Sequence, residues 1–393
     1  MRTPAGRLRA SASDARQVGR CCRHLGPDNF DTHFMIPRDP VAAATHADPY
    51  PYYARLRRES PVGYDSGLGL WVAATADAVQ AALAHPALRV RPAAEPVPKA
   101  LVGTPVGEVF ARLVRMNDGE FHARHRPDVQ RAAARFTLAD VAGAAEEAVR
   151  DLAPRVNANA FLSAVPVQSI ARLLGVPPAS LDRTVACVEA FVQGIGANAS
   201  GQMIALANDA VAELVAQGEA QGLDPVRSAN RIALMQQSLD ATAGLIGNTV
   251  LSLRRRPEVL APGARPEEWR AVVSEVARWD PPVQNTRRFA ATDLVLAGET
   301  ITQGQGVLVL LASANRDPGL NNDPDAFDAH RAVRRGLGFG AGAHACPGES
   351  IAVEIAAAAL RTLVASAGLG LFAEHTGYRP LPNARIPTFS AVS

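Results

Sequence analysis

The sequence has few aromatic residues, few cysteines and no long run of charge of one sign. Phe, Trp and Tyr make up 5% of the 393 residues, which disfavours the aromatic platforms that stack nucleic-acid bases. The formal net charge is only +2, and no basic run is long enough to form a nucleic-acid-binding face. We therefore expect no nucleic-acid partner.

The cysteine pattern also excludes a disulfide framework. The chain has four cysteines, of which Cys21 and Cys22 are adjacent and Cys187 stands alone. Disulfide-stabilised domains carry more cysteines at regular spacings, and they occur in oxidising compartments. The sequence therefore favours a reducing location, and we expect the protein to be cytoplasmic.

A membrane-spanning segment is not predicted. The most apolar long stretch, residues 232–253, is interrupted by Gln236, Gln237, Asp240 and Asn248, which is typical of a buried helix. Residues 1–34 are rich in arginine and lack the apolar core of a signal peptide. We interpret residues 1–34 as a disordered extension, or as upstream sequence before a natural start at Met35, and we expect no membrane association.

Helical periodicity dominates the rest of the chain. Amphipathic stretches cover residues 51–59, 76–84, 140–152, 163–174, 180–195, 204–217, 226–255, 266–278 and 348–367. Strand-like segments are fewer, at 69–73, 294–297 and 306–311, with a terminal hairpin expected near 379–389. No internal repeat or low-complexity linker divides the chain. We predict one domain over residues 35–393, mainly α-helical with a small β lobe.

One cysteine lies in a glycine-rich loop that limits its chemistry. Residues 339–348 read Phe-Gly-Ala-Gly-Ala-His-Ala-Cys-Pro-Gly, and Cys346 is the eighth of them. Pro347 suits the first position of a following helix, and amides at a helix start favour a thiolate. A thiolate in this position can ligate iron. The residues alone also allow a structural cysteine, a hydrolase nucleophile assisted by His344, or half of a zinc site.

The spacing of Phe339, Gly342, His344, Cys346 and Gly348 resembles the haem-ligating loop of the cytochrome P450 family. The resemblance implies that Cys346 is the iron ligand and that its thiolate favours cleavage of the O–O bond. Gly342 and Gly348 would let the backbone turn tightly beside a flat macrocycle. Phe339 would shield one side of the sulfur from water. Gly340, in the same loop, is a further cofactor contact.

A second motif follows the same family order. Glu275 and Arg278 are three residues apart on a predicted helix, so they share one face and can pair. Alone they would be an ordinary surface pair. The segments that follow, residues 279–290, 315–318 and 324–327, resemble the family's loops downstream of this helix. The resemblance implies that Glu275, Arg278 and Arg331 form a buried structural network that holds the cysteine loop.

The resemblance also implies residues for the two haem propionates, which need cations or hydrogen-bond donors when buried. Residues 117–126 resemble the family's helix with a histidine and an arginine four residues apart. His122 and Arg126 would therefore reach one carboxylate region together. By the same matching, Arg288 and His344 are further propionate contacts.

The resemblance covers residues 35 to the end and implies the cytochrome P450 fold, a triangular helical globule around a buried haem b (iron protoporphyrin IX). It implies a monomeric monooxygenase of secondary metabolism that uses O2. The electrons would come from ferredoxin and an NADH- or NADPH-dependent ferredoxin reductase. We expect a basic face with Arg334, Arg335 and Arg361 to receive the acidic ferredoxin. A small or medium apolar substrate would be hydroxylated, with Gln237, Asn285 and Asn383 available to anchor a polar group.

The helix expected above the iron departs from the family pattern. Residues 237–242 read Gln-Ser-Leu-Asp-Ala-Thr. The family acid is present as Asp240, but Ala241 stands at the position of the usual threonine, and Ser238 replaces a glycine. A methyl group can neither donate nor accept a hydrogen bond. Thr242 lies about 100° further round an ideal helix. We hypothesise that Ser238 or Thr242, through water, replaces the missing alcohol.

Other interpretations of Ala241 remain. In the first, the substrate supplies a hydroxyl; in the second, the enzyme is a peroxygenase driven by hydrogen peroxide; in the third, the outcome is desaturation or oxidative coupling. In the fourth, Ala241 is a neutral replacement in a slow monooxygenase. A protein of another class, a haem-binding sensor without catalysis, would contain the same cysteine loop.

Overall fold

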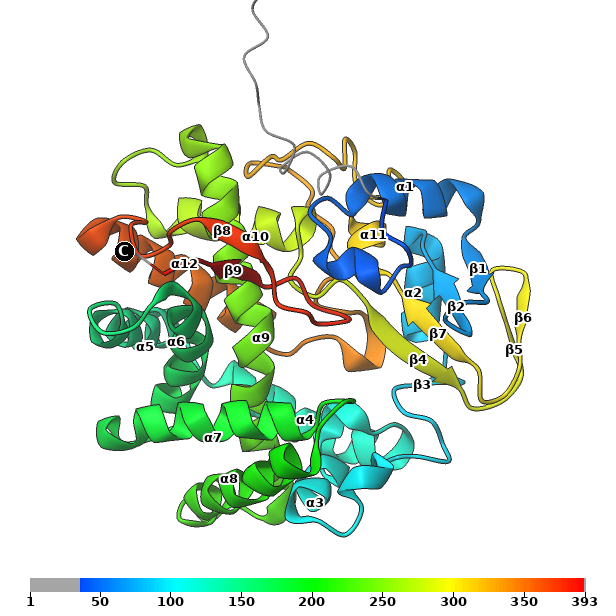
Figure 1. Cartoon of the computed structure of the whole chain (residues 1–393), viewed down its shortest axis with the longest axis horizontal. Helices are drawn as coiled ribbons and strands as arrows, with labels where there is room; N and C mark the ends of the chain where they lie inside the picture. Colours follow the sequence, from blue (N-terminus) through cyan, green and yellow to red (C-terminus); the bar gives the residue numbers. More distant parts are fainter. Residues whose placement is uncertain (1–35, 392–393) are drawn as a thin grey trace, which may run out of the picture. The chain divides into compact units, whose positions relative to one another are not determined.

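The computed structural model describes residues 36–391, and Ile36–Ser393 form one compact unit. The predicted extension at residues 1–34 lies outside the described residues. Long helices make up most of the unit, with a small sheet to one side of them (Figure 1). The helices are α1 (Tyr50–Glu59), α2 (Ala76–Ala84), α3 (Pro105–Ala111), α4 (Gly119–Ala134), α5 (Leu138–Leu152), α6 (Ala158–Leu173), α7 (Leu181–Gly194), α8 (Gly201–Glu219), α9 (Pro225–Arg255), α10 (Pro266–Trp279), α11 (Leu311–Asn315) and α12 (Glu349–Ala367).

The main sheet has five strands in the order β1-β2-β7-β4-β3. Its strands are β1 (Val62–Asp65), β2 (Leu70–Ala73), β3 (Leu88–Arg89), β4 (Thr286–Ala290) and β7 (Gly306–Val309). β2 and β7 are parallel, with Trp71 opposite Val307, and the other neighbours are antiparallel. Two antiparallel pairs complete the strands, β5 (Leu294–Leu296) with β6 (Glu299–Ile301), and β8 (His375–Tyr378) with β9 (Pro387–Phe389). The prediction of a mainly helical fold with a small β lobe is confirmed.

The predicted and observed helix boundaries differ most at helix starts. The helix expected from residue 140 begins at Leu138, because the Thr137 side chain accepts the Asp140 N–H and the Asp140 carboxylate accepts the Thr137 N–H. The helix expected from residue 163 begins five residues earlier, at Ala158, because Asn157 caps it. These capping side chains were the missed signal.

Several strand and turn predictions were wrong in detail. The strand predicted at 306–311 ends at Val309, because α11 begins at Leu311. β4 was not predicted. The terminal hairpin has its first strand at 375–378, before the predicted segment. Pro347 precedes α12, whose N-cap is Gly348, so it does not occupy the first helical position.

The centre of the fold is α9, which packs against α6, α8, α10 and α12. Its start is fixed by the Asp224 carboxylate, which accepts the N–H groups of Val226 and Arg227. All its residues from 242 to 253 are buried. A Cβ on Gly244 would lie 2.6 Å from the Pro282 Cβ atom and 2.9 Å from the Arg385 carbonyl oxygen. Only glycine allows this close approach, which fixes α9 against the segments around Pro282 and Arg385.

One helix of the described part of the chain, α12, is long and apolar enough to cross a membrane by length and composition, with a mean hydropathy of 1.5. The stretch 232–253, which we expected to be the most apolar, is not apolar enough to span a membrane. α12 packs against α5, α9 and α10, and ten of its residues are buried. It is therefore a core helix of this fold.

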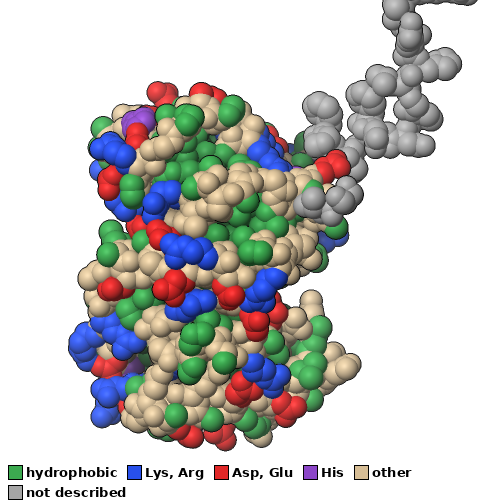
Figure 2. All heavy atoms as spheres, turned by 90° about the vertical axis from the view of Figure 1, so that its left-hand side faces the viewer, with side chains coloured by type: hydrophobic (Ala, Val, Ile, Leu, Met, Phe, Trp, Pro, Cys, Tyr) green, Lys and Arg blue, Asp and Glu red, His purple; other side chains and the backbone are tan. Residues whose placement is uncertain are grey.

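Acidic and basic side chains are interspersed on the face where α5 and α12 lie (Figure 2). Several are paired along one helix or between neighbouring helices, such as Arg150 with Glu146 and Arg361 with Glu146. Arg361 was expected in a basic patch for ferredoxin. Its charge is instead offset by Glu146, 2.6 Å away.

The ion pair of Glu275 and Arg278 generates a stability prediction. Both side chains are fully buried, with exposed fractions of 0% and 1%. Replacing Arg278 by Ala removes the nearest cationic partner of the buried Glu275 carboxylate and the donor to the Pro324 and Ala326 carbonyls, so we expect the free energy of unfolding to fall by about 3–5 kcal/mol. Arg183→Ala, which breaks the exposed pair with Glu213, should lower the free energy of unfolding much less, because solvent screens an exposed pair. Urea denaturation measures both; equal effects would contradict a buried role for Arg278.

Candidate functional site

The cysteine loop is a compact turn between the short 3-10 helix at Gly342–His344 and α12. The Cys346 N–H donates to the Phe339 carbonyl at 2.8 Å, which closes the loop on itself. The Gly348 N–H points at the Cys346 Sγ atom from 3.4 Å. Main-chain contacts therefore fix where the sulfur lies.

Of the two glycines expected to allow the tight turn, Gly342 does so and Gly348 does not. Gly340 and Gly342 have positive φ angles, 72° and 68°, which L side chains rarely adopt. Gly342 also lies against the end of α2, where an added Cβ would be 3.4 Å from the Leu83 carbonyl oxygen. Gly348 has an ordinary φ of −109°, so the tight turn depends on Gly340 and Gly342. Gly348 contributes its N–H to the sulfur instead.

The helix end alone does not favour a thiolate. Desolvation raises the pKa of the Cys346 thiol, against the lowering effect of the Gly348 N–H and of the Arg126 charge. This differs from the expectation drawn from Pro347, because the first turn of α12 starts after the sulfur. A metal ion, by contrast, deprotonates a coordinating thiol outright.

The loop is anchored to α10 through Arg278 and Glu275. The Arg278 Nη2 atom donates to a Glu275 carboxylate oxygen at 2.6 Å and to the Ala326 carbonyl at 2.9 Å, and its Nη1 atom donates to the Pro324 carbonyl at 2.7 Å. Asn315 continues the connection, because its Oδ1 atom accepts the Leu337 N–H at 2.6 Å, just before the loop begins.

Two further arginines reach the same carboxylate. The Arg331 Nε atom lies 3.6 Å from Glu275 Oε1, where the sequence placed it. The Arg334 Nε atom donates to Glu275 Oε2 at 3.0 Å, although we expected Arg334 to face a redox partner. Of the predicted basic face, only Arg335 lacks a carboxylate partner among residues 36–391. The expectation of a three-residue basic patch was therefore wrong.

The predicted propionate residues converge beside the cysteine loop. His122 and His344 lie with ring centroids 4.3 Å apart, and an Arg126 guanidinium nitrogen donates to the Ala345 carbonyl. Among the described residues, His122 Nε2 and Arg126 Nε are buried without a hydrogen-bond partner. Arg288, on β4, is 6% exposed and donates only to Thr286 and the Arg287 carbonyl. Such a set of uncompensated donors fits a cofactor that carries carboxylates.

One residue that supports this set was missed. The Asp118 carboxylate accepts the Val90 N–H at 2.9 Å and lies 3.0 Å from His344 Nε2. Burial raises the pKa of Asp118, but the hydrogen bonds from His344 and Val90 outweigh it and lower the pKa below its ordinary value. Asp118 and His344 are 226 residues apart in sequence, so no local pattern predicts their contact.

On α9, two of the four residues expected above the iron have well-defined partners. The Ser238 hydroxyl donates to the Met235 carbonyl of its own helix at 2.7 Å. Asp240 lies 3.7 Å from the Arg379 guanidinium, and burial raises the pKa of its carboxyl. Ala241 is half-buried and Thr242 is 1% exposed. Within residues 36–391, no hydrogen bond engages the Thr242 hydroxyl, unlike that of Thr249, which donates to Leu245.

Two of the three side chains expected to anchor a polar group of the substrate already form hydrogen bonds with main-chain carbonyls. The Asn285 side chain is buried and donates to the Pro382 carbonyl at 2.9 Å. The Gln237 side-chain amide donates to the Ala233 carbonyl at 3.2 Å, which leaves its carbonyl oxygen as an acceptor. Asn383 is exposed. Asn285 is thus a structural residue, contrary to our expectation.

Comparison with known proteins places this geometry in a family. The family model described as cytochrome P450 matches residues 269–365. A 20-oxo-5-O-mycaminosyltylactone 23-monooxygenase from Streptomyces fradiae is 27% identical over 80% of this chain and 81% of its own length. A biotin biosynthesis cytochrome P450 from Bacillus subtilis is 40% identical, over 36% of each chain.

Solved structures agree over nearly the whole chain. P450BioI, in complex with acyl carrier protein carrying hexadec-9Z-enoic acid, has a TM-score of 0.71 and 25% identity, covering 86% of this chain and 96% of its own. P450 RauA, with a biosynthetic intermediate of aurachin RE, has a TM-score of 0.74 and 25% identity, covering 91% and 98%. With the cysteine loop, its anchor and the flanking basic set described above, these matches show that the chain belongs to the cytochrome P450 family of haem-dependent oxidoreductases.

Proposed function

We propose that the protein is a haem b monooxygenase that uses O2 and electrons from a ferredoxin to oxidise a small to medium apolar compound, most simply by hydroxylation. The arrangement of the cysteine loop beside His122 and Arg126 carries the proposal. Two buried donors, His122 Nε2 and Arg126 Nε, lack partners among the described residues and lie against His344 and Ala345 of the loop.

The chain's own residues would hold the cofactor in three ways. Cys346 Sγ would be the iron ligand, supported by the Gly348 N–H. His122, Arg126, Arg288 and His344 would hold the two propionates, since charge-assisted hydrogen bonds are the strongest available contacts for carboxylates. Phe339 and Gly340 would contact the macrocycle. When bound, haem supplies an iron centre that activates dioxygen, and a thiolate ligand favours O–O bond cleavage.

Proton delivery would run through Asp240 and Thr242. Burial raises the pKa of the Asp240 carboxyl, against the lowering effect of the Arg379 charge, and a raised pKa suits a carboxyl that donates a proton. The Thr242 hydroxyl is free to hold a water. Ser238 is the weaker candidate, because its hydroxyl hydrogen is committed to the Met235 carbonyl.

A second candidate function is favoured by Ala241. Peroxide already carries both oxygen atoms in reduced form, so a peroxygenase needs no protons delivered to reduced dioxygen, and a methyl group at residue 241 would suit it. Desaturation or oxidative coupling on the same fold would also be compatible with Ala241.

The relatives support the proposed substrate class. The names above refer to a mycaminosyltylactone, an aurachin RE intermediate and hexadec-9Z-enoic acid on its carrier protein, the last of which is a long apolar chain. We therefore propose a role in secondary metabolism, with a monomeric enzyme in the cytoplasm and an NADH- or NADPH-dependent ferredoxin reductase upstream. Arg335 is the remaining basic candidate of the predicted ferredoxin face.

The proposed ligand is tested by spectroscopy. The reduced, carbon-monoxide-bound protein should show the red-shifted absorption band typical of thiolate-ligated haem, and Cys346→Ser should lose it. Cys187→Ser is the control, because this buried thiol lies on α7, and it should leave the band unchanged. Retention of the band in Cys346→Ser would disprove the ligand. Substrate-dependent NADH oxidation with ferredoxin, compared with peroxide alone, separates the two candidate functions.

The role of Thr242 is tested by coupling efficiency. Thr242→Val keeps the shape but removes the hydroxyl, so product formed per NADH should fall about tenfold or more, with a matching rise in released peroxide. Ser238→Ala should change the ratio little. Thr249→Val, at a buried threonine two turns along α9, is the matched control. Unchanged coupling in Thr242→Val and in the double variant with Ser238→Ala would rule out both hydroxyls.

Asp118 predicts a specific pH dependence. Its lowered pKa means that the folded state favours the carboxylate, so this stabilisation is present above about pH 4, the ordinary carboxyl range. It is lost as pH falls through the lowered folded-state value. Asp118→Asn should reduce the free energy of unfolding by about 1–2 kcal/mol at pH 7.

The difference between Asp118→Asn and the native protein should shrink as pH is lowered from 5 to about 3. Denaturation curves at each pH measure it. Asp209→Asn, at an exposed position on α8, serves as the control and should show no such trend. A difference that stays constant with pH would show that the Asp118 carboxylate is not linked to folding.

A further inference from the structure

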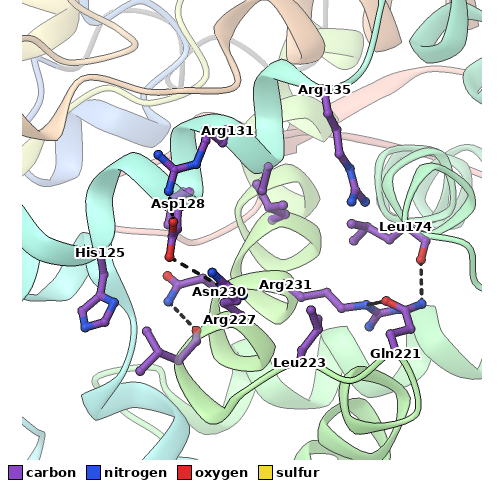
Figure 3. A pocket seen from close by; sticks show the side chains of 14 residues that line it. His125, Asp128, Arg131, Arg135, Leu174, Gln221, Leu223, Arg227, Asn230 and Arg231 are labelled. Atoms are coloured by element: carbon purple, nitrogen blue, oxygen red, sulfur yellow. Dashed lines mark hydrogen bonds and ion pairs between the residues drawn. The ribbon is translucent and has the colours of Figure 1, made fainter.

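A cavity of about 260 Å³ lies away from the cysteine loop. It is formed by the C-terminal half of α4, the first turns of α9, the turn between α8 and α9, and Leu174 after α6 (Figure 3). None of its lining residues belongs to the proposed haem or oxygen-activation sets. The inference below therefore does not depend on the proposed reaction.

One buried arginine in this cavity lacks a carboxylate. Arg231 is 4% exposed. Its Nε and Nη1 atoms donate only to side-chain amide oxygens, of Gln221 at 3.2 Å and Gln217 at 3.4 Å. Its Nη2 atom is buried without a hydrogen-bond partner among residues 36–391. An uncompensated buried charge is costly, so a native guanidinium in this state indicates a missing anionic partner.

The other buried arginines make this exception informative. Arg278, Arg316 and Arg385 pair with Glu275, Asp325 and Asp280. Among arginines that the described part of the chain buries, this leaves Arg231 and Arg288 without a carboxylate. Arg288 is the residue proposed to meet a haem propionate. The same signature at Arg231 favours a carboxylate-like or phosphate-like ligand.

A second guanidinium points into the same cavity. Arg135, which follows the last residue of α4, extends toward Arg231 in the close-up view (Figure 3). Burial, and secondly the Arg135 charge, lower the pKa of Arg231. The acidic group that lines the cavity, Asp128, is already paired with Arg131 and with Arg227 at 3.6 Å. It therefore does not neutralise Arg135 and Arg231.

Much of the remaining wall is apolar, although His125, Gln221 and Asn230 also line the cavity. The apolar lining residues are Val129, Ala132, Leu174, Leu223, Val226 and Leu234. An inorganic ion would leave this surface uncovered, whereas an organic anion would bury its apolar part there and gain from the hydrophobic effect. We propose that the cavity binds a small organic anion with an apolar body, whose carboxylate or phosphate group is held by Arg231 and Arg135.

The occupant would join the two helices that carry the proposed haem chemistry. α4 bears His122 and Arg126, and α9 bears Asp240 and Thr242. A ligand that binds only the folded state stabilises that state. Binding should therefore raise the melting temperature of the whole protein.

The test uses the full-length, haem-loaded protein saturated with a haem-ligating imidazole, so that binding above the iron is blocked. Octanoate, octyl phosphate, inorganic phosphate and 1-octanol are titrated by calorimetry and by thermal melting. Octanoate or octyl phosphate should bind and raise the melting temperature. Inorganic phosphate and 1-octanol should each bind at least about tenfold more weakly, because each lacks one of the two contacts.

Variants identify the residues that hold the anion. Arg231→Gln and Arg135→Gln should each weaken octanoate binding at least about tenfold, while Arg231→Lys retains part of it. Arg135 is exposed, so its variant folds even if Arg231→Gln proves unstable. Arg55→Gln, at an exposed pair with Glu59 on α1, is the control.

Undiminished octanoate binding in Arg135→Gln and Arg231→Gln would overturn the proposal, as would equal binding of 1-octanol. Equal binding of inorganic phosphate and octanoate would overturn the assignment of an apolar body. Tighter binding of octyl phosphate than of octanoate would assign the anion as a phosphate monoester, and the reverse order would assign it as a carboxylate.

Discussion

The buried contact between Arg278 and Glu275 is the constraint on which the cysteine loop depends. One guanidinium satisfies the carboxylate on its own helix and, at the same time, carbonyl groups of the 315–326 segment. In a low-dielectric interior these bonds support one another, and removal of one partner leaves the others unsatisfied. Because Leu337 is held through Asn315, the main chain enters the loop from a fixed position. The sulfur of Cys346 is thus positioned from α10, although the two are far apart in sequence.

Arginine has two distinct uses in this fold. Where a carboxylate of the chain is present, as at Arg278 and Arg385, the guanidinium joins segments and also saturates carbonyl groups. Arg231 and Arg288 are buried without a carboxylate partner among the described residues, and the Arg231 side chain lines a cavity. Planar, permanently charged guanidinium is suited to both, since it stays charged when buried.

The sequence predicted what depends on neighbouring residues and missed what depends on distant ones. The cysteine loop was recognised because its glycines, histidine and cysteine lie within one short segment. Most helices were found from their periodicity, although α3, α4 and α11 were not among the predicted amphipathic stretches. Arg334 was assigned to the ferredoxin face because nothing in the loop sequence shows that Arg334, and not its neighbour Arg335, turns toward Glu275. Asp118 was missed because its partner His344 lies across the fold. A motif defined by residue types alone likewise could not predict that the Ser238 hydroxyl donates to the Met235 carbonyl of its own helix.

The close approach at Gly244 fixes the position of α9 independently of the side chains at residues 237–242. Contacts with Pro282 and the Arg385 carbonyl set the rotation and depth of the helix, one turn beyond Ala241. Residues 237–242 are therefore presented on a helix whose placement does not rely on their own side chains. Substitutions in that turn can alter reactivity while the scaffold stays intact.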